Sequence, residues 1–218
     1  RDCESLVDEM RNANARITYL CSPNNPTGEV LSIDTIEAIA STAKGLVIVD
    51  EAYIEFGGSS CTGLLGRFEN LLLTRTFSKA LGLAGFRLGY GIASPAIIRR
   101  IEGARGPYKV SAISEAVGAS VLDNDLEWVD DKAREAVANR ELLAAAVVDM
   151  GLQPLKSGAN FVLIPVNDSR ELDARLRKRS VAVRAFQGLN GIGDALRVTV
   201  GPWPMMERFI DILSEVIQ

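Results

Sequence analysis

The chain has 218 residues, a net charge of −4 and no histidine, and hydrophobic residues make up 47% of it. The missing imidazole excludes Ser-His-Asp and Cys-His nucleophile pairs and His-ligated metal centres from within this chain. Any proton transfer must therefore use lysine, tyrosine, cysteine or a carboxylate, and no metal ligands are expected. The length suffices for one large domain or two small ones.

Charge and hydropathy also limit the kinds of partner that the chain is expected to bind. Neither half of the chain has the excess of positive charge expected of a nucleic-acid-binding protein. The longest apolar runs, such as residues 142–148, are far shorter than the ~20 residues of a membrane span. Cys3, Cys21 and Cys61 are widely spaced and form no C-x-x-C pair, which predicts free thiols in a reducing, cytoplasmic setting. The chain begins with Arg1, which indicates a processed chain or a fragment.

Short apolar runs alternate with helical spacing through the first half, a pattern typical of βαβ units and a parallel sheet. Asp34 and Glu37 have the spacing of a capping box for the first intervening helix, and Gly45 is expected to stop that helix. Ser94 followed by Pro95 predicts the start of another helix. The expected strands are residues 17–21, 46–50, 71–74 and 88–93.

The second half is richer in helix. A long helix is expected to end at Gly151, with Pro154 shortly beyond. The remaining pattern predicts a small α+β layer with strands at 160–165, 181–185 and 196–200 and helices at 169–179 and 205–217. We predict a partial large domain over 1–110, connecting helices over 111–150 and a small domain over 151–218.

Unusual residues follow three of the expected strands, where parallel α/β sheets collect ligands. The run S-P-N-N-P-T-G at 22–28 forms a rigid loop around Asn24 and Asn25, although a plain strand-to-helix turn has the same composition. Asp50 ends a buried strand and opens D-E-A-Y. It is either a helix N-cap or a carboxylate that meets a cationic or hydrogen-bonding partner.

The third strand leads into T-R-T-F-S-K-A at 74–80 and a glycine-rich run at 82–91. Thr76, Ser78 and Arg87 together suit a phosphate, and Lys79 is either a further phosphate ligand or a nucleophilic amine. Neither a P-loop nor a dinucleotide-binding fingerprint is present. Thr76-x-x-Lys79 echoes the S-x-x-K of penicillin-binding acyl transferases, but the companion motifs S-D-N and K-T-G are absent.

Taken together, these residues match what pyridoxal 5'-phosphate requires: a lysine for the aldehyde, hydroxyls and an arginine for the phosphate, and a carboxylate for the ring nitrogen. The order N-P-T-G, D-E-A-Y, S-K and G-x-R-x-G resembles the fold-type I pyridoxal-phosphate aminotransferases, most closely the histidinol-phosphate aminotransferase branch. The resemblance covers essentially the whole chain. It implies an α/β transferase fold with a partial, mostly parallel large-domain sheet, flanking helices and a small α+β domain.

The resemblance also implies residue roles. Lys79 would form the Schiff base and later move the proton from the substrate's Cα to the cofactor. Asp50 would pair with the pyridinium nitrogen, and Tyr53 and Asn25 would bind the ring's 3-oxygen. Thr76, Ser78 and Arg87 would hold the cofactor phosphate.

Two arginines of the small domain are candidate substrate ligands. In L-R-V-T-V-G, Arg197 alternates with apolar residues and so faces away from the apolar side of its strand. By itself this pattern is that of a solvated edge-strand arginine. The resemblance implies that Arg197 anchors both the carboxylate of glutamate and the phosphate of histidinol phosphate, and that Arg184 is a second phosphate contact.

The implied reaction is amino transfer between histidinol phosphate and 2-oxoglutarate in histidine biosynthesis, by a cytoplasmic homodimer. Members of the family are longer, so a loop that caps the cofactor and a tyrosine from the dimer partner are absent from this sequence. We expect weak cofactor retention and little turnover from these 218 residues alone.

Three alternatives remain open. Threonine-phosphate decarboxylase shares the cofactor motifs, although that branch often has phenylalanine where Tyr53 stands. An aromatic aminotransferase of the same branch is the second. The third is the aminotransferase-like, cofactor-sensing domain of a transcription regulator, which would carry a basic helix-turn-helix segment upstream.

Overall fold

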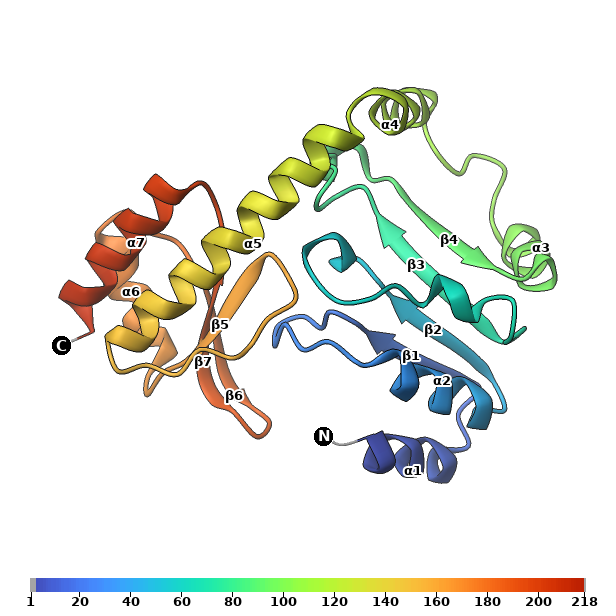
Figure 1. The fold of residues 1–218 in the computed structure, drawn as a ribbon, viewed down its shortest axis with the longest axis horizontal. Helices are drawn as coiled ribbons and strands as arrows, with labels where there is room; N and C mark the ends of the chain where they lie inside the picture. Colours follow the sequence, from blue (N-terminus) through green and yellow to red (C-terminus); the bar gives the residue numbers. More distant parts are fainter. Residues whose placement is uncertain (1–2, 218) are drawn as a thin grey trace. The chain divides into compact units, whose positions relative to one another are not determined.

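A computed structural model describes residues 3–217. The chain divides into two compact units (Figure 1). The first contains the described residues up to Pro23 together with 30–130. The second contains the short loop 24–29 together with residue 131 and beyond. The loop that carries N-N-P-T-G therefore belongs to the second unit, whose other residues come more than a hundred positions later in the sequence.

The first unit is built on a four-stranded sheet with the order β1-β2-β3-β4. β1 pairs with β2 and β2 with β3 in parallel, as predicted, whereas β3 and β4 are antiparallel. The connection from β3 to β4 contains no α-helix to serve as a crossover, and the two strands run antiparallel. The elements are α1 (Cys3–Ala13), β1 (Ile17–Cys21), α2 (Ile33–Thr42), β2 (Leu46–Asp50), β3 (Leu71–Thr76), β4 (Gly89–Ala93), α3 (Pro95–Ala104) and α4 (Ala112–Asn124).

The start of α2 corrects one prediction. Ser32, and not the Asp34 and Glu37 pair, caps the helix, because the Ser32 side chain accepts a hydrogen bond from the Thr35 backbone N–H. At the other end the helix stops at Thr42 without needing Gly45. Gly45 is instead required by close packing, since a Cβ there would lie 2.2 Å from the carbonyl oxygen of Arg16. Ser94 and Pro95 begin α3 as predicted.

The core of the first unit lies between α1, α2 and one face of the sheet. β2 alternates partly buried and buried side chains, so that every second residue points into this core, whereas the first three residues of β3 are all buried. The buried members of the cluster are Val7, Ile36, Ile39, Val47, Val49, Cys61, Leu64, Leu71 and Leu73. This packing fixes the ends of β2 and β3, which carry the candidate site.

The second unit contains α5 (Leu126–Asp149), β5 (Phe161–Pro165), α6 (Ser169–Lys178), β6 (Arg184–Leu189), β7 (Gly193–Thr199) and α7 (Trp203–Val216). The strands form an antiparallel sheet with the order β5-β7-β6. Leu143, Val162, Leu196 and Phe209 belong to the core that the helices form with one face of this sheet. The α+β layer predicted from the sequence is present.

The β6–β7 hairpin is displaced from its predicted position. The strand expected at 181–185 begins at Arg184, and the one expected at 196–200 begins at Gly193. Positive backbone φ angles at Gly188, Gly191 and Gly193 give the turn a tight, irregular course with a register shift. These glycines, a residue type that usually interrupts strands, form the turn that joins β6 to β7.

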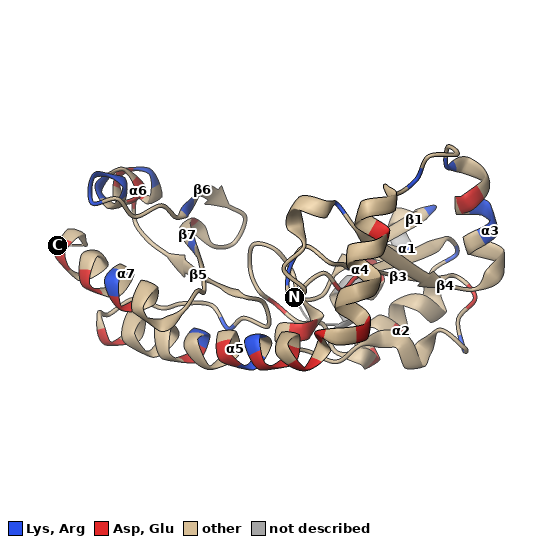
Figure 2. Ribbon diagram, turned by 90° about the horizontal axis from the view of Figure 1, so that it is seen from above, with Lys and Arg blue, Asp and Glu red and all other residues tan. Residues whose placement is uncertain are grey.

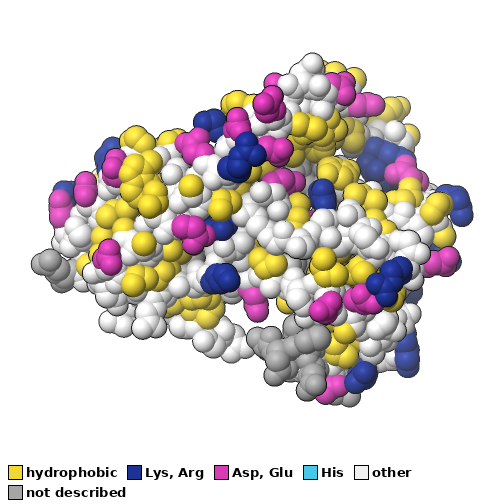
Figure 3. Space-filling model, in the orientation of Figure 1, with side chains coloured by type: hydrophobic (Ala, Val, Ile, Leu, Met, Phe, Trp, Pro, Cys, Tyr) yellow, Lys and Arg dark blue, Asp and Glu magenta, His cyan; other side chains and the backbone are white. Residues whose placement is uncertain are grey.

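Acidic and basic residues are interspersed along α5 (Figure 2), and acidic and basic side chains are interspersed on the face shown in Figure 3. Arg134 pairs with Asp131 and Lys132 with Glu135 along this helix. Within the described residues, no helix is both long and apolar enough to span a bilayer. Among the described side chains, Cys21 and Cys61 are free thiols, whereas the side chain of Cys3 lies outside the described residues.

Candidate active site

The two motifs D-E-A-Y and T-F-S-K leave one edge of the first unit's sheet. Asp50 is the register partner of Thr74, and β3 continues to Thr76. The Glu51 backbone N–H donates to the Thr74 carbonyl at 2.9 Å, which extends the parallel pairing one residue past the end of β2. The side chains that follow these strands therefore start from adjacent points on the same edge, as the sequence predicted.

The Asp50 carboxylate has a defined orientation. Its Oδ1 accepts a hydrogen bond from the Ala52 backbone N–H at 3.0 Å, and its Oδ2 accepts one from the Tyr19 hydroxyl at 2.5 Å. The short helix that follows, Ile54–Phe56, has Tyr53 at its N-cap position. Asp50 is thus not the cap of that helix. It closes a local turn and points its carboxylate to the strand edge.

Lys79 and Tyr53 are in contact. The Nζ atom of Lys79 lies 5.1 Å from the centroid of the Tyr53 ring, a distance at which an ammonium group is attracted to the ring face. Tyr53 is buried, whereas Lys79 is exposed. The Tyr53 ring thus holds the accessible Lys79 side chain in one place.

The candidate phosphate ligands lie in the turn between β3 and β4. Thr76 Oγ1 accepts a hydrogen bond from the Ser78 backbone N–H at 3.0 Å, so both hydroxyls belong to one turn. Gly82, at φ +71°, donates its N–H to the Lys79 carbonyl and tightens the loop that follows. The guanidinium of Arg87 donates to the Ala84 carbonyl at 2.9 Å within its own loop. Its phosphate contact stays a prediction.

The second unit places Asn25 against Arg197. The Arg197 Nη1 donates to Asn25 Oδ1 at 2.6 Å, which joins residues far apart in the chain. The loop that carries Asn25 is tied down by a bond from the Gly158 N–H to the Gly28 carbonyl at 2.7 Å. A Cβ on Gly28 would lie 2.2 Å from the Ser157 Oγ. A plain strand-to-helix turn does not need such contacts with residues distant in the sequence.

Arg184 and Arg197 stand directly opposite each other on β6 and β7. Both therefore project from the same face, away from the buried Leu196 and Val198 as the alternation predicted. Like charges at such positions repel unless an anion lies between them. The Nε atom of Arg197 is buried and has no hydrogen-bond partner among the described residues, which leaves a donor available for a ligand.

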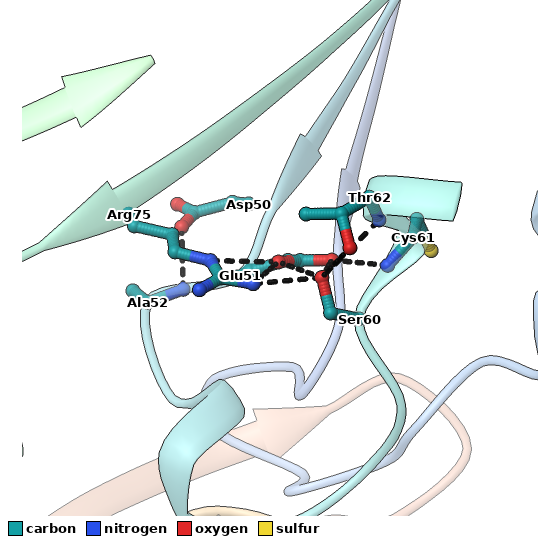
Figure 4. A network of polar contacts seen from close by, with 7 residues as sticks. All are labelled: Asp50, Glu51, Ala52, Ser60, Cys61, Thr62 and Arg75. Carbon is teal, nitrogen blue, oxygen red and sulfur yellow. Dashed lines mark hydrogen bonds and ion pairs between the residues drawn. The ribbon is translucent and has the colours of Figure 1, made fainter. Parts of the chain in front are cut away.

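Sequence reasoning missed a buried network beside Asp50 (Figure 4). The Glu51 side chain is 1% exposed, and its carboxylate accepts bonds from the Arg75 Nε at 2.9 Å, the Ser60 hydroxyl and the Cys61 N–H. Burial and the Glu51 carboxylate raise the pKa of the Cys61 thiol to about 11. The one signal in the sequence was that successive side chains of an extended chain point to opposite sides, so Glu51 points away from Asp50.

The predicted site residues thus form two sets, each described within its own unit. The first unit holds Asp50, Tyr53, Thr76, Ser78, Lys79 and Arg87, and the second holds Asn25, Arg184 and Arg197. Direct contacts join Lys79 to Tyr53 and Asn25 to Arg197.

Comparison with known proteins identifies the family of the chain. A family model described as aminotransferase class I and II matches residues 1–213. The chain is 37% identical over 223 residues to histidinol-phosphate aminotransferase 1 of Carboxydothermus hydrogenoformans. This match covers 100% of this chain and 63% of that protein. It is 33% identical over 215 residues to histidinol-phosphate aminotransferase of Caldanaerobacter subterraneus subsp. tengcongensis, covering 98% of this chain and 61% of that protein.

Among solved structures, the histidinol-phosphate aminotransferase of Sinorhizobium meliloti in complex with pyridoxal-5'-phosphate superposes with a TM-score of 0.90 at 28% identity. The match covers 99% of this chain and 61% of that one. The predicted fold class is confirmed. The chain spans 61% and 63% of the length of the two curated relatives named above.

Proposed function

Since the chain belongs to the aminotransferase class I and II family, we propose that it is the lysine-bearing part of an enzyme that transfers the amino group of histidinol phosphate to 2-oxoglutarate. The enzyme depends on pyridoxal 5'-phosphate. We also propose that the whole protein is a cytoplasmic homodimer, with residues 1–110 in the cofactor-binding domain, 111–150 in connecting helices and 151–218 in the small domain.

The observation that carries the proposal is the Lys79 amine beside the Tyr53 ring, at the sheet edge that ends in Asp50. The donor set fits the cofactor by its chemistry. An accessible amine suits an aldehyde, an oriented carboxylate suits a protonated ring nitrogen, and two hydroxyls in one turn suit a phosphate. Each of these groups is present in the first unit.

When bound, pyridoxal phosphate supplies an aldehyde that condenses with amines and a protonated ring that accepts the electron pair of a C–H bond. Lys79 would hold the cofactor covalently and would take the proton from the substrate's Cα. Asp50 would keep the ring nitrogen charged. Tyr53 and Asn25 would bind the ring's 3-oxygen, as the family resemblance implies, and Thr76, Ser78 and Arg87 would bind the phosphate.

Substrate binding is assigned to the second unit. Arg197 offers a planar fork that suits either a carboxylate or a phosphate, so one side chain can serve both the donor and the acceptor. Its buried Nε needs a partner, and a substrate anion is the partner we assign. Arg184 lies directly opposite and adds charge for the dianionic phosphate group. The names of the relatives point to histidinol phosphate as the donor.

The test uses the whole protein reconstituted with pyridoxal 5'-phosphate and reduced with borohydride. We expect the mass label on Lys79 and its loss in Lys79→Ala, whereas the exposed Lys44 serves as a matched control in Lys44→Ala. A label on another lysine contradicts the assignment.

A second assay identifies the reaction. Glutamate formation from histidinol phosphate and 2-oxoglutarate supports the proposal, and carbon dioxide release from threonine phosphate supports the decarboxylase instead. Amination of an aromatic 2-oxo acid in preference to the phosphorylated substrate would indicate an aromatic aminotransferase. The 218 residues alone should retain cofactor weakly and turn over little.

A further inference from the structure

We propose that Tyr19 is a positioning residue for Asp50, and that its hydroxyl sets the orientation of the carboxylate toward the ring nitrogen of the cofactor. This inference rests on the proposed function, because it takes Asp50 as the partner of that nitrogen. It adds a residue of β1, a strand to which the sequence motifs assign no role.

The first step is the geometry of the contact. Tyr19 is the register partner of Ile48, and Asp50 is the partner of Cys21, two residues farther along β1. Tyr19 therefore crosses diagonally over the sheet to place its hydroxyl 2.5 Å from Asp50 Oδ2. Diagonal neighbours on one face of paired strands are within reach of aromatic side chains.

The second step concerns the two carboxylate oxygens. The Ala52 backbone N–H binds Oδ1 at 3.0 Å, and the Tyr19 hydroxyl binds Oδ2. A carboxylate offers about four acceptor sites, so a further donor such as a ring N–H can still be accommodated. With one donor on each oxygen, the plane of the carboxylate is held from both sides. Among the contacts of the described residues, the backbone bond alone remains to define it without Tyr19.

The third step is the place of Tyr19 among the described residues. Its residue is 56% exposed, and it does not belong to the buried cluster under the sheet. Burial of the hydroxyl and the Asp50 carboxylate raise the pKa of Tyr19, so the group is a protonated donor at neutral pH. The part of this side chain that contacts Asp50 is its hydroxyl, which a Tyr19→Phe substitution removes at almost constant volume.

The test compares Tyr19→Phe, Asp50→Asn and Tyr108→Phe in the whole protein loaded with pyridoxal phosphate labelled with ¹⁵N at the ring nitrogen. Tyr108 is a matched control, since it is 98% exposed in this chain. The readouts are the ¹⁵N resonance of the bound cofactor, kcat and KM for each substrate, and the thermal midpoint.

We expect Tyr19→Phe to shift the ¹⁵N resonance and to lower kcat at least about tenfold, the effect of one hydrogen bond to a charged group. KM and the thermal midpoint should stay unchanged. A merely structural role would move the midpoint and leave the resonance in place, and would overturn the inference.

If Tyr19→Phe matches the unsubstituted protein in resonance and kcat while Asp50→Asn is impaired, the role of Tyr19 is wrong and the proposed function stands. If Asp50→Asn also leaves the resonance and the turnover unchanged, the assignment of Asp50 is wrong, and the inference about Tyr19 is overturned together with it. Tyr108→Phe should match the unsubstituted protein throughout.

Discussion

The carboxylate of Glu51, one residue past the end of β2, binds the guanidinium of Arg75 near the end of β3, with 2.8 Å between Oε2 and Nη2. The pair links the segment that carries Asp50 to the segment that carries Thr76 and Lys79 (Figure 4). It is nearly buried, since the side chains of Arg75 and Glu51 are 20% and 1% exposed. The spacing of the candidate cofactor ligands therefore depends on a charge pair outside the site.

We predict that Glu51→Gln lowers the free energy of unfolding by about 3 kcal/mol, because it removes the carboxylate that contacts a largely buried guanidinium. Urea denaturation followed by circular dichroism measures the change. Glu37→Gln is the matched control. Glu37 pairs with Arg67 at the surface, where side-chain exposures are 32% and 58%, and an exposed pair contributes less than about 1 kcal/mol. Equal losses in both variants would contradict a special role for the buried pair.

Substitutions of Arg197 and Arg184 should change KM for different substrates. Arg197→Lys replaces the planar fork with a point charge, so we predict that KM rises about tenfold for both histidinol phosphate and 2-oxoglutarate. Arg184→Lys should raise KM for the phosphorylated donor alone. Steady-state kinetics with each substrate varied in turn measures both effects. A rise for 2-oxoglutarate in Arg184→Lys would show that the assigned roles are wrong.

Much of the fold was predictable because local signals agreed with tertiary packing. The limits of β1 and β2 were predicted to the residue, since an apolar run ends abruptly at Cys21 and at Asp50. The antiparallel return of β4 was not predicted, because strand direction depends on how the connecting loop closes in space. The β6–β7 hairpin was displaced for the same reason, since its position is set by a glycine turn and not by the apolar pattern.

The site likewise contains residues that the sequence singled out and residues that it did not. Motif residues such as Asp50 and Lys79 could be chosen as candidates from the sequence because their chemistry is unusual after buried strands. Tyr19 and Glu51 could not, since a tyrosine in a strand and a glutamate beside an aspartate are ordinary. Their roles depend on the parallel register that brings Tyr19 to Asp50 and Arg75 to Glu51.

Gly45 provides a test of close backbone packing. A Cβ at this position would lie 2.2 Å from the carbonyl oxygen and 2.5 Å from the carbonyl carbon of Arg16, which are backbone atoms and cannot turn aside. The same carbonyl accepts the Leu46 N–H that starts the β1–β2 pairing. We predict that Gly45→Ala lowers the free energy of unfolding by about 2–3 kcal/mol, a value typical of overpacking.

Gly66→Ala is the control for that experiment, because no atom lies within 4 Å of a Cβ built on Gly66. Its unfolding free energy should change by less than about 0.5 kcal/mol. If the two alanine variants unfold at the same denaturant concentration, contact with the Arg16 carbonyl does not limit residue 45.

Cys61 should make stability depend on alkaline pH. Burial and the neighbouring Glu51 carboxylate raise the thiol pKa from 9.0 to about 11 in the folded protein. A raised pKa means that the folded state holds the proton more tightly, so the thiol's stabilising contribution is complete below pH 9 and is lost as the pH rises to about 11. Two pKa units correspond to about 2.7 kcal/mol.

The measurement is the free energy of unfolding between pH 8 and 11 for the unsubstituted protein and for Cys61→Ala. The alanine variant starts lower because it loses buried volume, yet its curve should fall less steeply over this range, since the thiol no longer titrates. The difference between the two curves isolates Cys61 from the tyrosines and lysines that also ionise here. Parallel curves would mean that Cys61 has the same pKa in the folded and unfolded states.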